Sequence, residues 1–157
     1  MKIIKNILIG LGCLFGLFIV ITVFLSFKSS SFKNDYSPFV SKFMTEFSEN
    51  WEVGDIQYML SNDFLEQIET PNSRQAMAMF RQLGKIQQIQ DIELTNYRSN
   101  VGDNSFKLGE FVFKADFENA SGLVTMIVIV KDDGERVQGL NINPTAEISR
   151  VPAKTSI

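Results

Sequence analysis

Residues 106–118, FKLGEFVFKADFE, decide the expected fold because apolar and polar residues alternate along most of the segment. One parity holds Phe111, Phe113, Ala115 and Phe117. Successive side chains of a strand point to opposite sides of a sheet, so the pattern predicts a strand with one apolar face. That face requires a second layer of structure to cover it.

Further strands are predicted before and after this segment. Residues 91–98 alternate apolar with polar positions, and residues 123–130 are apolar on both parities, as in a central strand covered on both sides. The dipeptide Asp133-Gly134 is typical of a hairpin turn. A last strand is expected over residues 136–142. The four strands predict an antiparallel meander.

Helices are predicted ahead of the strands. Ser37 and Pro38 suit the cap and the first residue of a helix. The helix they begin carries an apolar stripe of Val40, Phe43, Met44, Phe47 and Trp51. A later helix is expected to open with a capping box formed by Asn72 and Gln75 and to end at Gly84.

Helices followed by an antiparallel meander predict an α+β fold. We expect the helices to pack on one face of a curved sheet of about four strands. The phenylalanine face of residues 106–118 should then meet the helix that carries Trp51.

A separate apolar segment lies near the N-terminus. Residues 7–27, ILIGLGCLFGLFIVITVFLSF, contain no charged residue. At about 1.5 Å per residue, a helix of this length crosses the roughly 30 Å hydrocarbon core of a bilayer. We therefore expect a retained transmembrane helix. A cleaved signal peptide is the competing interpretation, but apolar regions of signal peptides usually span about 7–15 residues.

The charges around the apolar segment predict its orientation. Lys2 and Lys5 favour a cytoplasmic N-terminus and an extracytoplasmic C-terminal domain. Gly12 and Gly16 have the spacing that lets two membrane helices approach closely. The alternative is that glycine is simply common in membrane spans.

The expected domain organisation has four parts. Residues 1–27 form the anchor and the serine-rich residues 28–35 form a flexible linker. Residues 36–144 form the α+β domain, and residues 145–157 form a flexible tail. Membrane lipid is the partner expected for the anchor.

Composition excludes several kinds of chemistry. The chain of 157 residues has no histidine and one cysteine, Cys13, which lies in the apolar segment. Imidazole bases, cysteine–histidine nucleophiles and thiolate zinc sites are therefore not expected. With 18 acidic against 15 basic residues, the chain lacks the basic character of nucleic-acid-binding proteins. We expect no cofactor and no metal site. The acidic residues Asp132, Asp133 and Glu135 suit a solvated hairpin tip better than a cation site.

Three segments carry a resemblance to a known group of proteins. They are residues 38–55 (PFVSKFMTEFSENWEVGD), residues 60–68 (LSNDFLEQI) and residues 128–144 (VIVKDDGERVQGLNINP). Across residues 36–144 the chain resembles the nuclear transport factor 2-like superfamily, in particular small membrane-anchored bacterial proteins of unknown function. Arg136 stands where that family commonly has a tryptophan.

The resemblance implies a cone of helices wrapped by a strongly curved sheet. Cystatin-like folds share much of this order of elements and remain an alternative. The superfamily contains isomerases, dehydratases and non-catalytic binding domains, so the resemblance alone does not select a function.

The first functional hypothesis is a non-catalytic interaction module that is tethered to the membrane and binds a protein partner or a second copy of itself. It depends on an apolar patch expected on the sheet face opposite the helices, since such patches mark interfaces. The residues assigned to this partner surface are Phe106, Leu108, Val112, Val124, Met126, Val128 and Val130. The alternative is that the same chain covers this face.

Two further hypotheses remain. An isomerase or dehydratase would need a buried carboxylate as its base. The candidates are Asp55, Asp91 and Asp116, with Tyr58 or Tyr97 as hydrogen-bond donors. The last hypothesis is a carrier or sensor that holds a small apolar ligand between the helices and the sheet. The many phenylalanine and methionine residues suit such a cavity and an ordinary packed core equally well.

Overall fold

The computed structural model describes residues 29–102 and 105–145. The predicted membrane span with Gly12 and Gly16, and the predicted tail beyond residue 145, lie outside these residues. Within the two described ranges, no helix has the length and apolarity needed to span a bilayer. The chain divides into two compact units, Met1–Asp35 and Tyr36–Ile157. The second unit contains the sheet described below.

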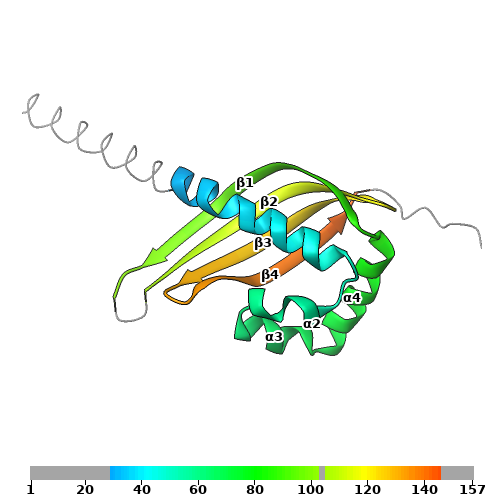
Figure 1. The fold of residues 1–157 in the computed structure, drawn as a ribbon, viewed down its shortest axis with the longest axis horizontal. Helices are drawn as coiled ribbons and strands as arrows, with labels where there is room; N and C mark the ends of the chain where they lie inside the picture. The colour runs from blue at the N-terminus through cyan, green and yellow to red at the C-terminus, as the bar shows by residue number, and fades with distance from the viewer. Residues whose placement is uncertain (1–28, 103–104, 146–157) are drawn as a thin grey trace, which may run out of the picture. The chain divides into compact units, whose positions relative to one another are not determined.

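The fold is α+β, with helices first and a four-stranded antiparallel sheet after them (Figure 1). The strands lie in the sheet in chain order. The elements are helical residues 29–48, α2 (Val53–Ile56), the 3₁₀ turn η1 (Gln57–Met59), α3 (Asn62–Ile68), α4 (Pro71–Leu83), β1 (Ile86–Asn100), β2 (Phe106–Phe117), β3 (Ser121–Lys131) and β4 (Gly134–Pro144).

The start of the first helix differs from the prediction. Residues 29–35 are helical, although a flexible linker was expected there, and Ser37 and Pro38 lie inside the helical segment. The Ser31 hydroxyl donates to Asp35 Oδ2 at 3.2 Å, one helical turn away. This contact helps a serine-rich stretch to remain helical, because it gives the side chain a partner at the i,i+4 spacing.

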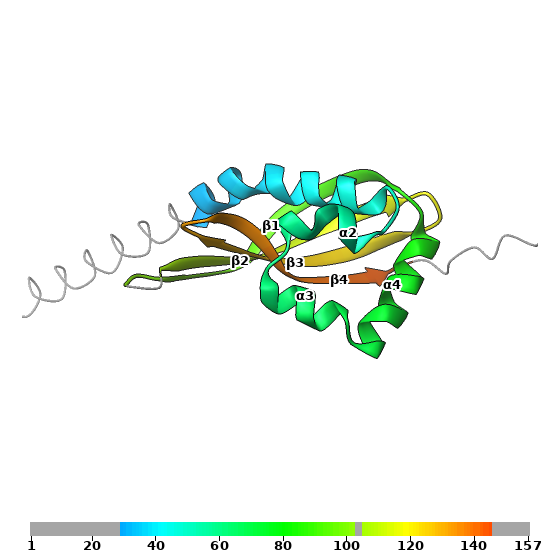
Figure 2. The same ribbon diagram turned by 60° about the horizontal axis from the view of Figure 1, so that its bottom comes forward.

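The predicted core face of β2 is confirmed. Phe111, Phe113, Ala115 and Phe117 are all buried. The opposing layer is the helix of residues 36–48, which lies along this inner face of the sheet (Figure 2). Its buried residues are Val40, Phe43, Met44 and Phe47. Apolar side chains from two layers therefore form one core.

The residues of β3 that were assigned to the partner surface lie on the other face of the sheet. Met126 lies opposite Phe111 and Val124 lies opposite Phe113 in the β2–β3 register. Directly opposite residues share a face of the sheet, so these side chains point into the core. Val124, Met126 and Val128 are fully buried and do not contribute to an outer surface. Val130 follows the same parity and lies opposite Lys107.

Helix α4 ends with Gly84 as its C-cap, as predicted. Ser61 Oγ accepts a hydrogen bond from the Phe64 amide at 3.2 Å and caps α3. The capping box of Asn72 and Gln75 is wrong, because α4 begins earlier, with Thr70 as its cap and proline as its first residue. Proline lacks an amide hydrogen and has a fixed φ, which suits the first helical position.

The strand β1 is longer and more irregular than predicted. Its pairing with β2 shifts register at three places, and Asp91 adopts a positive φ of 53° within one of them. Bulges of this kind increase the local twist and hinder pairing with another chain at an edge strand.

Trp51 joins the helix layer to the sheet just after the first helix. It adopts a φ of 56°, and its amide donates to Phe47 O at 2.9 Å. Its indole Nε1 donates to Gly84 O at 3.1 Å. The indole centroid lies 5.1 Å from that of Phe47, 5.7 Å from Phe80 and 6.0 Å from Phe117. One side chain thus contacts the first helix, α4 and β2.

We predict that Trp51→Ala lowers the free energy of unfolding by about 3–5 kcal/mol, because a large buried aromatic leaves a cavity. Trp51→Phe keeps a ring but leaves the Gly84 carbonyl without its donor, and should cost about 1–3 kcal/mol. Urea unfolding followed by far-ultraviolet circular dichroism measures both. Equal losses for the two variants would contradict the role given to ring packing.

Candidate functional site

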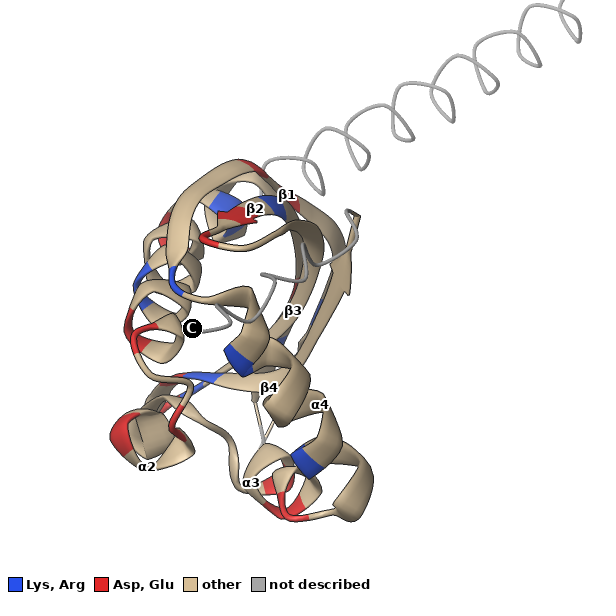
Figure 3. Ribbon diagram, turned by 90° about the vertical axis from the view of Figure 1, so that its right-hand side faces the viewer, with Lys and Arg blue, Asp and Glu red and all other residues tan. Residues whose placement is uncertain are grey.

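The outer face of the sheet carries an apolar patch on its two central strands. We call this the outer apolar patch, and its residues are Phe106, Leu108 and Val112 of β2 and Leu123, Ile127 and Ile129 of β3. Within the second unit, the helices lie within the curve of the sheet or near β4, and none lies on the outer side of β3 (Figure 3).

The strand register places these side chains next to one another. Leu108 lies directly opposite Ile129. Ile127 lies opposite Gly139 of β4, where an added Cβ would come within 3.3 Å of Ile127 Cδ1. The isoleucine side chain therefore rests against the glycine, which keeps this part of the outer face flat.

The exposure of the patch varies along the strands. Leu123 is 41% exposed, whereas Ile129 is 9% exposed, and the other four residues are half-buried. Neighbouring side chains on the same face account for part of this shielding. The patch is moderately exposed and is interrupted by polar side chains on the same face, since Glu110 lies opposite Ile127, Thr125 opposite Val112 and Lys114 opposite Leu123.

Polar residues border the patch on the outer strands. On β1, Gln90 lies opposite Lys114 and Glu93 lies opposite Val112. On β4, Asn141 and Asn143 lie opposite Thr125 and Leu123. An apolar centre with a polar border is the usual arrangement of a protein interface.

Only part of this patch was identified from the sequence. Phe106, Leu108 and Val112 lie on the outer face as expected, and Leu123, Ile127 and Ile129 were missed. Because β3 is apolar on both parities, its pattern does not show which face meets the core. The length of the β2–β3 turn was the available signal, since turn geometry sets the register of a hairpin.

The candidate catalytic carboxylates do not converge. Asp55 accepts a hydrogen bond from Asn50 Nδ2 at 2.7 Å near α2. Asp91 pairs with Lys114 Nζ at 3.1 Å, and both side chains are more than half exposed. Each contact is a surface interaction.

Asp116 also lies at the surface, where it accepts hydrogen bonds from Ser121 Oγ at 2.6 Å and Gln90 Nε2 at 3.1 Å. Tyr97 lies opposite Gly109 on β1 and is half-buried. Tyr58 is 58% exposed. Its hydroxyl donates to Glu46 Oε2 at 2.7 Å, and this hydrogen bond to a carboxylate raises the pKa of the phenol.

We predict that Glu46→Gln lowers the pKa of Tyr58 toward its ordinary value of 10.0, because the neutral amide no longer stabilises the protonated phenol. Absorbance of phenolate at alkaline pH measures the titration of the three tyrosines. The difference from a Tyr58→Phe variant gives the part that belongs to Tyr58. A raised folded-state pKa stabilises the fold fully below the unfolded pKa, and this contribution disappears as pH rises through the folded pKa.

Glu52→Gln is the matched control. Its carboxylate pairs with Arg81 Nη2 at 2.8 Å and does not contact the phenol. This variant should leave the Tyr58 titration unchanged. An equal shift in both variants would show that general surface charge, and not the direct hydrogen bond, sets the pKa.

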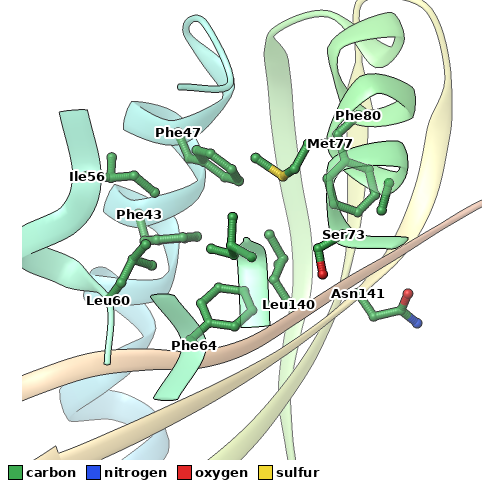
Figure 4. Close-up of a pocket in the computed structure, with 12 residues that line it drawn as sticks. Phe43, Phe47, Ile56, Leu60, Phe64, Ser73, Met77, Phe80, Leu140 and Asn141 are labelled. Carbon is green, nitrogen blue, oxygen red and sulfur yellow. The ribbon is translucent and has the colours of Figure 1, made fainter. Parts of the chain in front are cut away.

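A second feature is an apolar pocket of about 110 Å³ beneath the α3–α4 hairpin, which we call the α3–α4 pocket (Figure 4). None of the residues that line it is charged. They are Phe43, Phe47, Ile56, Leu60, Phe64, Ile68, Ser73, Ala76, Met77, Phe80, Leu140 and Asn141. None of the five candidate catalytic residues is among them.

The acidic residues of the β3–β4 hairpin form no recognisable metal centre. Among residues 29–102 and 105–145, no group of three or more histidine, cysteine, aspartate or glutamate side chains is placed to hold a metal ion. A polar depression of about 160 Å³ lies beside the hairpin, where Lys131, Asp133 and Arg136 meet the start of α3. Its charges have both signs, so it selects no single class of ion.

Comparison with protein-family models, with curated proteins and with solved structures finds no match to this chain. The fold is therefore described as α+β without assignment to a family.

Proposed function

We propose that this protein is a non-catalytic interaction module, tethered to a membrane, that binds a protein partner or a second copy of itself through the outer apolar patch. The observation that carries the proposal is the group of six apolar side chains on the outer side of β2 and β3, among which only Glu110, Thr125 and Lys114 are polar. Burying such a surface is favourable because it removes apolar area from water.

The surroundings of the patch also support this proposal. The polar border on β1 and β4 would remain in contact with solvent at the rim of an interface. By contrast, the carboxylates considered as catalytic bases lie at separate surface positions with local partners. The patch is therefore the better basis for a function.

We further propose that residues 7–27 hold the chain in the inner membrane of a bacterium, with the folded domain outside the cytoplasm. The support for this location is the uncharged run and the charges of Lys2 and Lys5. Membership of the nuclear transport factor 2-like superfamily is likewise a proposal. Its support is the sequence of residues 38–55, 60–68 and 128–144, together with the order of helices followed by a meander.

The partner surface predicts a specific effect of charge. Leu108→Lys places an ammonium group in the patch opposite Ile129 and Arg98, with no carboxylate opposite it, and should reduce association at least tenfold, because the charge would be desolvated in the interface. The full-length chain is extracted in mild detergent, and its mass and associated proteins are measured by light scattering and mass spectrometry.

Gln88→Lys is the matched control, since it adds the same charge on the outer face of β1, opposite Asp116 and away from the patch. It should leave association unchanged. A wild-type chain that is strictly monomeric and recovers no partner would refute the proposal, as would equal association of both variants.

The proposed anchor predicts the behaviour of the full-length chain in cell membranes. It should remain in the membrane pellet after extraction at alkaline pH, and a chain lacking residues 1–30 should be released. Immunoblotting of pellet and supernatant measures this. Recovery of a mature chain that begins near residue 30 and is free of membranes would show cleavage instead of anchoring.

A further inference from the structure

We propose that the α3–α4 pocket binds the uncharged end of an unbranched aliphatic chain. This site lies on the inner side of the sheet and does not depend on the outer apolar patch. The proposal follows from the apolar side chains that line the pocket, their lack of charge and the volume of the pocket.

The two sides of the pocket differ in how firmly they are packed. On one side, Phe43, Phe47 and Ile56 belong to the main core and are at most 3% exposed. On the other side, α3 contains no buried residue, and α4 buries only Leu83.

The apolar side chains of the hairpin that face the pocket are all half-buried. They are Phe64, Ile68, Ala76, Met77 and Phe80. An apolar occupant would complete their burial, and the loosely packed hairpin provides a wall that is able to adjust to it.

The chemistry of the lining selects an apolar group. A charged group would lose its hydration without gaining a partner, because no lining residue is charged. The hydroxyl of Ser73 already donates to Gln67 O at 2.7 Å and lies 2.9 Å from Thr70 Oγ1. Asn141 is exposed, and its amide points away from the apolar side chains (Figure 4). A polar end of the ligand would therefore remain outside the pocket.

The volume selects a chain end over a ring. A cavity of about 150 Å³ lined by apolar side chains binds benzene. The α3–α4 pocket has about 110 Å³. At about 30 Å³ for each water-sized group, it accommodates about four methylene groups in a row.

The protein contains its own reporter for this pocket. Trp51 is the only tryptophan of the chain. It contacts the rings of Phe47 and Phe80, both of which line the pocket, and is itself only 3% exposed. A bromine atom held in the pocket would quench Trp51 fluorescence. Brominated molecules that are free in solution have little access to the buried indole.

The test measures quenching of Trp51 by 4-bromo-1-butanol in the full-length chain, held in lipid nanodiscs whose belt protein lacks tryptophan. We expect saturable quenching that unbrominated 1-butanol reverses. From 2-bromoethanol to 4-bromo-1-butanol, affinity should rise about fourfold for each methylene, and longer chains should gain little more. Bromobenzene should give no saturable quenching.

Two alanines of α4 provide matched variants. Ala76 lines the pocket, whereas Ala78 is exposed on the same helix. Ala76→Leu fills the pocket and should abolish saturable quenching, and Ala78→Leu should preserve it. An unchanged emission maximum of Trp51 shows that each variant keeps its fold.

Quenching that rises linearly with concentration in the wild-type chain would overturn the proposal, as would saturable quenching that persists in Ala76→Leu. An affinity that rises equally at every added methylene would contradict the limit set by the volume. Stronger binding of bromobenzene than of the bromoalcohols would reject the aliphatic class.

Discussion

The packing of Trp51 is the constraint on which the rest of the structure depends. A tryptophan at positive φ is unusual, because an L side chain is crowded in that region. Here the conformation ends the first helix and turns the indole toward α4 and β2. The indole hydrogen bond to Gly84 O then sets the separation between the end of α4 and the end of the first helix.

Gly84, whose carbonyl accepts the indole hydrogen bond, is the second residue that this arrangement requires. It has a φ of 76°, and a Cβ at this position would come within 2.5 Å of Glu118 Oε2 and 2.8 Å of Glu118 Cβ. Glycine alone therefore allows α4 to end and β1 to begin so close to β2. Ser48 Oγ accepts the Ile86 amide at 3.0 Å and ties the start of β1 to the first helix. The ion pairs Glu49–Lys85 and Glu52–Arg81 surround the same region, but their exposure makes each a minor contribution.

The predictable parts of the fold are those in which one local pattern determines the outcome. The alternation of Phe113, Ala115 and Phe117 with Lys114 and Asp116 was enough to identify the inner face of β2. The faces of β3 depend on register, because Met126 and Ile127 are both apolar and only the pairing with β2 tells them apart. The start of α4 was missed for a related reason, since Thr70-Pro71 is able to end one helix or begin the next. The α3–α4 pocket depends on how several elements meet, so no local pattern predicts it.

The outer apolar patch is confined to β2 and β3 by the composition of the strands beside them. A central strand with apolar residues on both parities has a second apolar face whenever helices cover only one side of the sheet. On β1 the outward positions hold glutamine, glutamate, asparagine and arginine, and on β4 they hold asparagine, glycine and arginine. If the second face were meant for a further layer of the same domain, apolar residues would be expected on all four strands. Their restriction to the two central strands matches a bounded interface, with Ile127 and Glu110 facing each other near its centre and amide side chains at its edge.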